Sequence, residues 1–308
     1  MIKHLTHNKI DKTRWDECIR NSFNGNIYAW SWYLDIVHPR WEALVENDYE
    51  KVMPLTSNKK YGISYLFQPF FTQQLGVFAT SHLTEDIVQN FIDAIPQKFR
   101  LIEMRLNTYN KVDYNIDYFE RHRNIELDLI SDYQSLYNNY STNTKRNLNK
   151  AKGQRLYFNN DISPQHIVEL FKSNKGKDIK HWKDKEYQRL LELIDTAIKK
   201  EACFVIGVND DNDNTIAGAV FMVSHEKIVF LFSGSDETNK ENHAITFLID
   251  GIIKDFSGTP LTLDFEGSDN EGLARFYKGF GGKEIYYPEI RRNNMKGLFK
   301  VISKIMGK

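Results

Sequence analysis

Cysteine is scarce in this chain: Cys18 and Cys203 are its two cysteines among 308 residues. They lie in different halves of the chain, so a fold held by several disulfides is excluded and a reducing compartment is favoured. Residues 1–10 lack the apolar core of a signal peptide, and no run of about 18 apolar residues follows. We therefore expect a cytoplasmic protein without a membrane span.

Net charge is also lacking, because lysine plus arginine and aspartate plus glutamate both number 41. The chain as a whole has no electrostatic preference for nucleic acid or membrane, so a polyanion site would require a local patch. The nine histidines form no HxxxH pair, which argues against zinc. Phosphate loops, dinucleotide fingerprints and G-x-S-x-G elbows are missing as well. We expect no metal and no tightly bound cofactor.

The sequence does contain enough apolar material for two cores. Hydrophobic residues make up 41% and aromatic residues 13% of the chain, and domains of about 150 residues are common. Each half begins with helices, continues with mostly antiparallel strands, and ends in a strand–helix–strand unit. We predict an α/β (α+β) protein with domains at residues 1–131 and 132–290 and a basic helix at 291–308. Helices are expected at 12–21, 28–37, 84–95, 133–152, 164–174, 184–200, 244–256 and 270–278.

The most specific order of residues lies near the end of the chain, where Leu263-Asp-Phe-Glu-Gly-Ser268 is followed by Phe276-Tyr-Lys-Gly-Phe-Gly-Gly282. It predicts a strand at 261–265, a short helix, and a glycine-rich turn into a strand at 283–287. Asp264 and Glu266 are two apart on the predicted strand and would share one face. There they could deprotonate an acceptor ammonium, or serve as an ordinary helix cap and ion pair. On residues alone, an ordinary crossover with turn glycines explains the segment equally well.

A second informative segment is basic. Asn143-Thr-Lys-Arg-Asn-Leu-Asn-Lys-Ala-Lys-Gly153 contains Lys145, Arg146 and Lys150 without an acid. On a helix Arg146 and Lys150 share one face, which could hold the phosphates of a nucleotide-linked precursor or of tRNA. The alternative is a solvated helix face opposite acids of another element.

Together the two segments resemble the FemABX branch of the GNAT acyltransferase superfamily. The basic run is similar to the Thr-Arg-Arg-Asn-Ile-Arg-Lys-Ala helix that opens the second FemABX domain, and Asp264-Phe-Glu-Gly-Ser268 is similar to its Asp-Phe-x-Gly-Ser region. The resemblance covers roughly residues 130–290. It implies two tandem GNAT-like domains, each a mixed, mostly antiparallel sheet flanked by helices, and an enzyme that transfers an aminoacyl or acyl group.

The resemblance also implies site residues. Tyr277 resembles the tyrosine that protonates the leaving group in many GNAT enzymes. Lys278 lies one position after the lysine of FemABX proteins, and Glu266 stands where that family usually has a small residue, often glycine. We predict these three as catalytic. The residues predicted to bind substrate are Lys145, Arg146, Lys150, Asp264 and, in the loop before Gly76, Gln73.

The acyl donor implied by the resemblance is aminoacyl-tRNA or acyl-CoA. The stretch 234–244, where GNAT enzymes bind the CoA pyrophosphate, starts with its only glycine, Gly234, and contains three acids. These acids would repel pyrophosphate and disfavour CoA.

The expected function is acyl transfer to an amine of a cell-envelope or nucleotide-sugar precursor, with a peptidoglycan precursor or another small molecule as substrate. The alternatives are a non-catalytic GNAT-like binding protein and a CoA-dependent small-molecule N-acetyltransferase. The basic tail either docks on its own domain or touches the anionic inner face of the membrane. The acceptor, the acyl group and the oligomeric state stay open.

Overall fold

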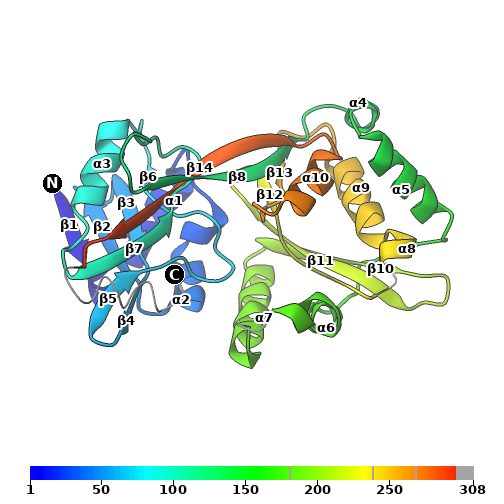
Figure 1. The fold of residues 1–308 in the computed structure, drawn as a ribbon, viewed down its shortest axis with the longest axis horizontal. Coiled ribbons are helices and arrows are strands. Elements are labelled where there is room, and N and C mark those ends of the chain that lie inside the picture. Colours follow the sequence, from blue (N-terminus) through cyan, green and yellow to red (C-terminus); the bar gives the residue numbers. More distant parts are fainter. Residues whose placement is uncertain (180–181, 238, 268, 296–308) are drawn as a thin grey trace. The chain divides into compact units, whose positions relative to one another are not determined.

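The computed structural model describes residues 1–295 except 180–181, 238 and 268 (Figure 1). The chain divides into two compact units. Unit 1 comprises Met1–His122 together with the described residues from Tyr286 on, and unit 2 comprises Arg123–Ile285. These bounds differ from the expected consecutive domains. The physical reason is that the chain passes between the units within two strands, β8 (Phe119–Asp128) and β14 (Lys283–Asn293), and not in a linker near residue 131.

Unit 1 contains two sheets. One has the antiparallel order β1-β2-β3-β6, and in the other β5 is parallel to β7 while β7 is antiparallel to β14. The helix expected at 12–21 is confirmed as α1 (Lys12–Asn21). The Asp11 carboxylate caps its first turn. Thr84 likewise caps α3. The bounds of the helices and strands of unit 1 are α1 (Lys12–Asn21), α2 (Ser31–Val37), α3 (Glu85–Asp93), β1 (Ile2–Leu5), β2 (Glu42–Glu46), β3 (Lys51–Leu55), β4 (Ser57–Lys60), β5 (Ile63–Leu66), β6 (Phe78–Ala79) and β7 (Phe99–Arg105).

The sheet of unit 2 has the order β8-β13-β12-β11-β10-β9. Its strands are antiparallel except for β12 and β13, which are parallel and pair at only three positions, from Lys227↔Thr262 to Val229↔Asp264. β12 then continues for six residues beyond Val229, whereas β13 ends at Asp264. The two strands therefore part at Asp264. The bounds are β9 (Tyr157–Asn159), β10 (Cys203–Asn209), β11 (Thr215–Ser224), β12 (Lys227–Ser235) and β13 (Thr262–Asp264).

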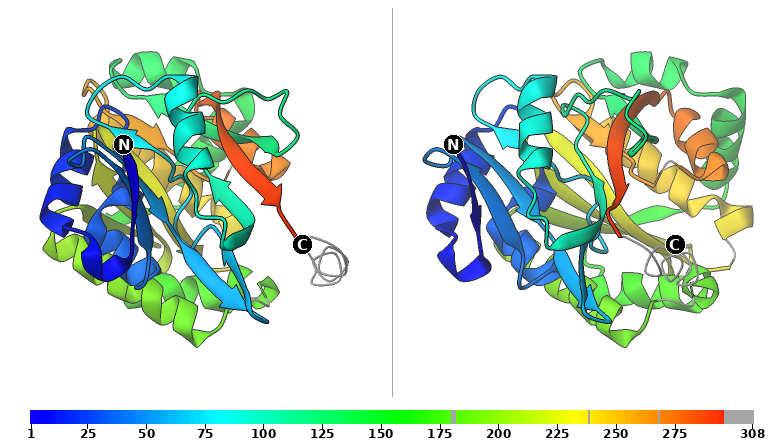
Figure 2. Two further views of the ribbon diagram at one scale, coloured as in Figure 1. Left: turned by 90° about the vertical axis from the view of Figure 1, so that its left-hand side faces the viewer. Right: turned by 60° about the vertical axis from the view of Figure 1, so that its left-hand side comes forward.

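Helices cover both faces of this sheet (Figures 1 and 2). On one face, α4, α5, α9 and α10 enclose the apolar core with side chains such as Leu127, Phe221 and Leu263. On the other, α6 packs on β11 and β12, and α7 packs on β10. The bounds are α4 (Tyr133–Asn138), α5 (Thr142–Lys152), α6 (Pro164–Ser173), α7 (Asp184–Lys199), α8 (Asn239–Asn242), α9 (Ala244–Phe256) and α10 (Glu271–Lys278).

Two expectations about helices need correction. The single helix expected at 133–152 is broken, because Ser141 is extended and its hydroxyl accepts a hydrogen bond from the Thr144 amide, which starts α5 anew. The basic helix expected at 291–308 does not begin at 291, because β14 continues to Asn293. The rest of that expected helix, residues 296–308, lies outside the described residues. None of the described helices is long and apolar enough to cross a membrane.

Gly234 has a packing role. It lies inside β12, and a Cβ placed on it would lie 2.2 Å from the carbonyl oxygen of Ile167 and 2.7 Å from the amide nitrogen of Phe171, both in α6. The absence of a side chain thus allows the α6 backbone to approach the sheet. The glycine at the start of the 234–244 stretch is explained by this contact.

Candidate functional site

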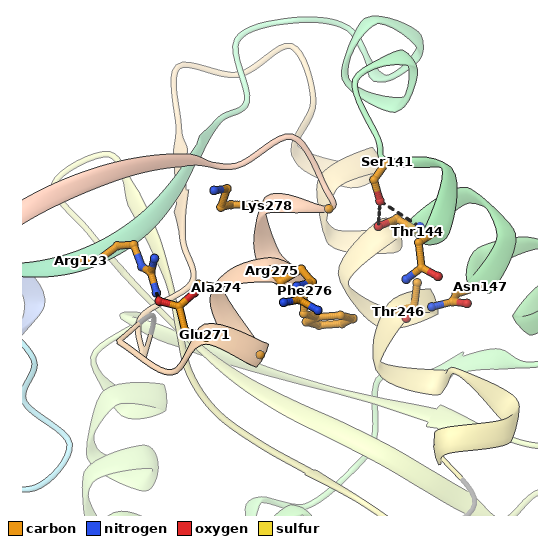
Figure 3. Close-up of a pocket in the computed structure, with 13 residues that line it drawn as sticks. Arg123, Ser141, Thr144, Asn147, Thr246, Glu271, Ala274, Arg275, Phe276 and Lys278 are labelled. Atoms are coloured by element: carbon orange, nitrogen blue, oxygen red, sulfur yellow. Dashed lines mark hydrogen bonds and ion pairs between the residues drawn. The ribbon is translucent and has the colours of Figure 1, made fainter.

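A cavity of about 740 Å³ lies in unit 2 (Figure 3). It is bounded by α10, by the first turns of α5 and by Thr246 of α9. Its polar lining consists of three cationic, two amide and three hydroxyl side chains and one glutamate. The lining residues are Arg123, Ser141, Asn143, Thr144, Asn147, Thr246, Glu271, Gly272, Ala274, Arg275, Phe276, Lys278 and Gly279.

The end of α10 is held against the start of α5. The Ser141 amide donates to the Gly279 carbonyl oxygen at 2.8 Å, and a Cβ on Gly279 would lie 2.4 Å from Thr144 Oγ1. Only glycine permits this approach without a shift. At the other end of α10 the Asn270 side chain accepts from the amides of Gly272 and Leu273. Both ends of the helix that lines the cavity are therefore fixed.

The cavity is positively charged. Arg123 pairs with Glu271 at 2.8 Å and with Glu284 at 3.5 Å, and Lys278 pairs with Glu284 at 2.9 Å. Arg275 takes part in none of the ion pairs among the described residues. An anionic group entering the cavity would thus find an uncompensated guanidinium and the exposed Lys278 ammonium beside the first turn of α5.

Tyr277 and Lys278, both predicted as catalytic, point in different directions. Lys278 lines the cavity, whereas Tyr277 is buried in the core of unit 2. The Tyr277 ring stacks on Phe265, and its pKa is raised by burial and further by the negative charge of Glu266. Successive residues of a helix are about 100° apart, which explains the divergence. The structure thus brings Lys278, but not Tyr277, into the cavity.

Asp264 and Glu266 do not form the strand pair that the sequence predicted. β13 ends at Asp264, and Glu266 has φ +52°, in the left-handed region. The two-residue periodicity of a strand therefore does not extend to Glu266. Instead, Asp264 Oδ1 accepts hydrogen bonds from the Glu266 amide at 3.0 Å and from Asn124 Nδ2 at 2.8 Å. The left-handed backbone at Glu266 is a conformation that glycine adopts at lower cost than glutamate.

The predicted basic residues lie on α5. Lys145 Nζ donates to the Asn138 carbonyl oxygen at 2.9 Å, and Arg146 donates to Asn143 Oδ1 at 2.5 Å. Burial lowers the pKa of His243, and the positive charges of Lys150 and Arg146 lower it further. Arg146 and Lys150 therefore lie near the residue that precedes α9, whereas Lys145 turns back toward α4.

Gln73 is the one predicted site residue in unit 1. It is buried, and its Oε1 accepts a hydrogen bond from Gln74 Nε2 at 2.7 Å. The loop containing it is further fixed by Gln68, whose Nε2 donates to the Thr72 carbonyl oxygen. Gln73 thus contributes to the internal packing of this loop.

Sequence reasoning missed Glu126 and Lys227. Glu126 lies opposite Asp264 in the β8–β13 register, and Lys227 Nζ donates to Glu126 Oε1. Burial and the neighbouring Asp264 raise the pKa of Glu126 to about 7, against the lowering effect of Lys227. In the sequence Glu126 is the polar position of the alternating run Ile125–Leu129, where a glutamate is expected to face solvent. Only the strand opposite shows that it faces Asp264.

A group of three potential metal ligands also occurs in unit 1. Ligand atoms of Glu120, His122 and Glu289 lie within 4.8 Å of one another. However, Arg291 pairs with both glutamates, at 2.9 Å and 3.4 Å, and Arg105 lies 3.5 Å from Glu289. These guanidinium groups already offset the negative charge that a cation would need.

Solved structures share this fold. FemX superposes with a TM-score of 0.64 and 12% identity over 99% of this chain and 100% of its own. L-PGS from Bacillus licheniformis has a TM-score of 0.56 and 9% identity over 96% of this chain and 95% of its own. A conserved protein of unknown function from Bacteroides thetaiotaomicron has a TM-score of 0.55 and 13% identity over 92% of this chain and 98% of its own. No family model matches the sequence, and no curated protein matches it.

These structural likenesses define the fold of the chain. The chain has the fold of FemX, with two units that each combine mostly antiparallel sheet with flanking helices. The expected fold class is therefore confirmed. At 9–13% identity the likeness says nothing further about chemistry.

Proposed function

We propose that this protein transfers an acyl or aminoacyl group to an amine, and that the cavity beside α10 receives the phosphate-bearing part of the donor. The observation that carries the proposal is the position of this cationic cavity. Its helix α10 follows β13 directly, at the point where the parallel strands β12 and β13 part. Ligands of open α/β sheets bind where neighbouring strands diverge at their carboxyl ends.

The charges of the cavity suit the two donors that the sequence resemblance implies. Aminoacyl-tRNA and acyl-CoA both carry phosphates, and Arg275 and Lys278 offer a guanidinium and an ammonium to them. Acyl transfer to an amine needs no covalent enzyme intermediate, since holding the donor carbonyl and the amine together supplies much of the acceleration. The acceptor that we propose is an amine of a cell-envelope or nucleotide-sugar precursor.

A donor screen tests the proposal. The purified protein is incubated with radiolabelled acetyl-CoA or charged tRNA and a panel of amino sugars and muropeptides, and amide product is measured. We expect product with one donor class, and an Arg275→Ala variant should raise the donor KM about tenfold or more through the lost charge-assisted contact. Arg40→Ala, which removes an exposed arginine of unit 1, is the matched control.

Two outcomes would contradict the proposal. Saturable binding of a donor or muropeptide without any turnover would make this chain a binding protein. If Arg275→Ala turns over with an unchanged donor KM, the cavity is not the donor site, although the protein does transfer acyl groups.

A further inference from the structure

Two arginines share one face of the sheet in unit 1 that contains β7 and β14. Arg292 of β14 lies opposite Ile102 of β7 in the antiparallel register. Directly opposed residues share a face, and so do residues two apart on one strand, such as Arg100 and Ile102. Ile102 belongs to the core that Phe91 of α3 also enters. Both arginines therefore leave the sheet on the face that α3 covers.

A cavity of about 620 Å³ is lined by both arginines. Its other walls come from the turn after α3, which contributes Ile95 and Pro96, and from residues 293–295 at the end of β14 and beyond. A second cavity, of about 510 Å³, shares Arg100 with the first and extends to β5. Sites for small organic ligands typically have volumes of this size. The two arginines thus face a space that is large enough for such a ligand.

The charges of the two arginines are not balanced by a neighbouring carboxylate. Over residues 1–295, apart from 180–181, 238 and 268, neither Arg100 nor Arg292 forms an ion pair. Arg292 Nε is buried and has no hydrogen-bond acceptor in this part of the chain, which is costly for a charged group. The Arg292 guanidinium lies over the ring of Tyr118, 5.6 Å from its centroid. Because like charges close together on one sheet face repel each other, an anion from outside the chain would stabilise the pair.

The rest of the chain offers these arginines no acidic side chain. Residues 296–308 contain four lysines and neither aspartate nor glutamate. Among the described residues that line the 620 Å³ cavity, Asp93 is the one acid, and its Oδ1 accepts a hydrogen bond from Gln89 Nε2 at 3.0 Å. Asp93 is also the last residue of α3, whose carbonyl end repels anions. An anion would therefore bind on the arginine side of the cavity.

We infer that Arg100 and Arg292 form an anion site of unit 1 that binds a phosphate monoester. Such a phosphate carries roughly 1.5 to 2 negative charges at pH 7, which matches two guanidinium groups. The planar N–H fork of arginine also suits pairs of phosphate oxygens. A single carboxylate would leave one of the two arginines without a counter-charge.

The cavity is larger than a phosphate group and would also hold the organic part of the ligand. Ile95, Pro96 and Phe99 supply apolar surface for it. A soluble phosphate monoester and the headgroup of phosphatidic acid both present this chemistry. The site does not depend on the proposed acyl transfer, because it belongs to unit 1 and the donor cavity belongs to unit 2.

Arginine Nε–H resonances test the site directly. The protein is labelled with ¹⁵N-arginine, the Arg292 resonance is identified by its loss in Arg292→Lys, and glycerol phosphate is titrated. We expect a saturable shift of the Arg292 resonance, with binding about tenfold weaker in Arg100→Ala through the lost charge-assisted contact. Asp93→Asn should bind more tightly, because a repelling charge is removed.

Two controls separate this site from the rest of the protein. Arg40→Ala removes another exposed arginine of unit 1, and Arg275→Ala removes an arginine of the donor cavity. Both should leave the shift of the Arg292 resonance unchanged. Since Arg100 is exposed, Arg100→Ala should fold like the unaltered protein. The inference is overturned if the Arg292 resonance does not shift, if it shifts equally with acetate, or if Arg100→Ala leaves the affinity unchanged.

A vesicle assay then distinguishes the two sources of the phosphate. The protein is sedimented with vesicles of phosphatidylcholine alone or mixed with phosphatidic acid. If the ligand is a lipid headgroup, phosphatidic acid should increase sedimentation of the unaltered protein more than that of Arg100→Ala, and glycerol phosphate should compete. If the ligand is soluble, the two proteins should sediment equally while glycerol phosphate still shifts the Arg292 resonance. The lysines of residues 296–308 are present in both proteins, so their attraction to the vesicles cancels in the comparison.

Discussion

Tyr277 lies flat against Phe265, with ring centroids 4.7 Å apart and ring planes 15° from parallel. This contact joins α10 to the residue that follows β13, and the Phe230 ring meets the Tyr277 ring edge-on from β12. The aromatic body of Tyr277 is thus part of the core that sets the position of α10. Its neighbour Lys278 lies in the cavity as a consequence.

Replacing Tyr277 with Phe should therefore change the free energy of unfolding by less than about 1 kcal/mol, because the stacked ring is kept. Tyr277→Ala should lower it by about 3–5 kcal/mol through the cavity that it leaves. Guanidinium unfolding of the three proteins measures both differences. If Tyr277→Phe folds normally but loses turnover, the hydroxyl takes part in the reaction, as the sequence resemblance implies.

Gly234→Ala should destabilise the protein by about 1–3 kcal/mol, because the new methyl group overlaps the α6 backbone at Ile167 and Phe171. Gly153→Ala is the matched control, since its nearest neighbour would lie at 3.3 Å and its φ is −71°. Thermal and urea unfolding give the comparison. Equal stability of the two variants would show that α6 moves freely on the sheet.

Glu266→Gly should raise the free energy of unfolding by up to about 1 kcal/mol. The left-handed conformation at φ +52° costs a residue with a side chain roughly 1–2 kcal/mol, and part of this gain is offset by the greater freedom of glycine in the unfolded chain. Glu266→Val should lower stability, because a β-branched residue is strained there. Urea unfolding at fixed pH distinguishes the two variants, and a destabilised glycine variant would mean that the glutamate side chain is needed for the turn.

Asp250 gives a prediction for the pH dependence of stability. The Tyr133 and Tyr140 hydroxyls both donate to its Oδ1 at 3.0 Å, and burial raises its pKa above the ordinary 3.8. A raised pKa means that the folded state binds the proton more tightly, so the contribution to stability is full below 3.8 and is lost as pH rises through the folded-state pKa.

Asp250→Asn keeps an oxygen for both hydroxyls and cannot titrate. The stability of the unaltered protein relative to Asp250→Asn should therefore fall as pH rises from 4 toward 7, as measured by urea unfolding at each pH. Asp250→Ala should cost about 1–3 kcal/mol at pH 4, because it leaves the two hydroxyls without an acceptor, and this cost should shrink as pH rises. A flat difference between the aspartate and asparagine proteins would contradict the raised pKa.

Local signals were enough to predict most elements. α1 and α9 have the predicted bounds, because amphipathic spacing and a cap or turn at each end are properties of neighbouring residues. The turn at the end of α10 also agrees, since Gly281 has φ +87° and suits glycine alone. The start of β8 at Phe119 was missed, because residues 120–124 are all charged or polar and show no apolar alternation. This part of the strand is stabilised by strands distant in the sequence.

The sequence by itself determined most of the helices, the late strand–turn–helix–turn order and the resemblance to FemABX proteins. Only the tertiary structure decided which side chains face each other. It directed Tyr277 into the core and Lys278 into the cavity, and it placed Glu126 of a distant strand opposite Asp264. The physical reason is that helix and turn formation depend on residues a few positions apart, whereas strand register and the burial that shifts a pKa depend on segments far apart in the chain.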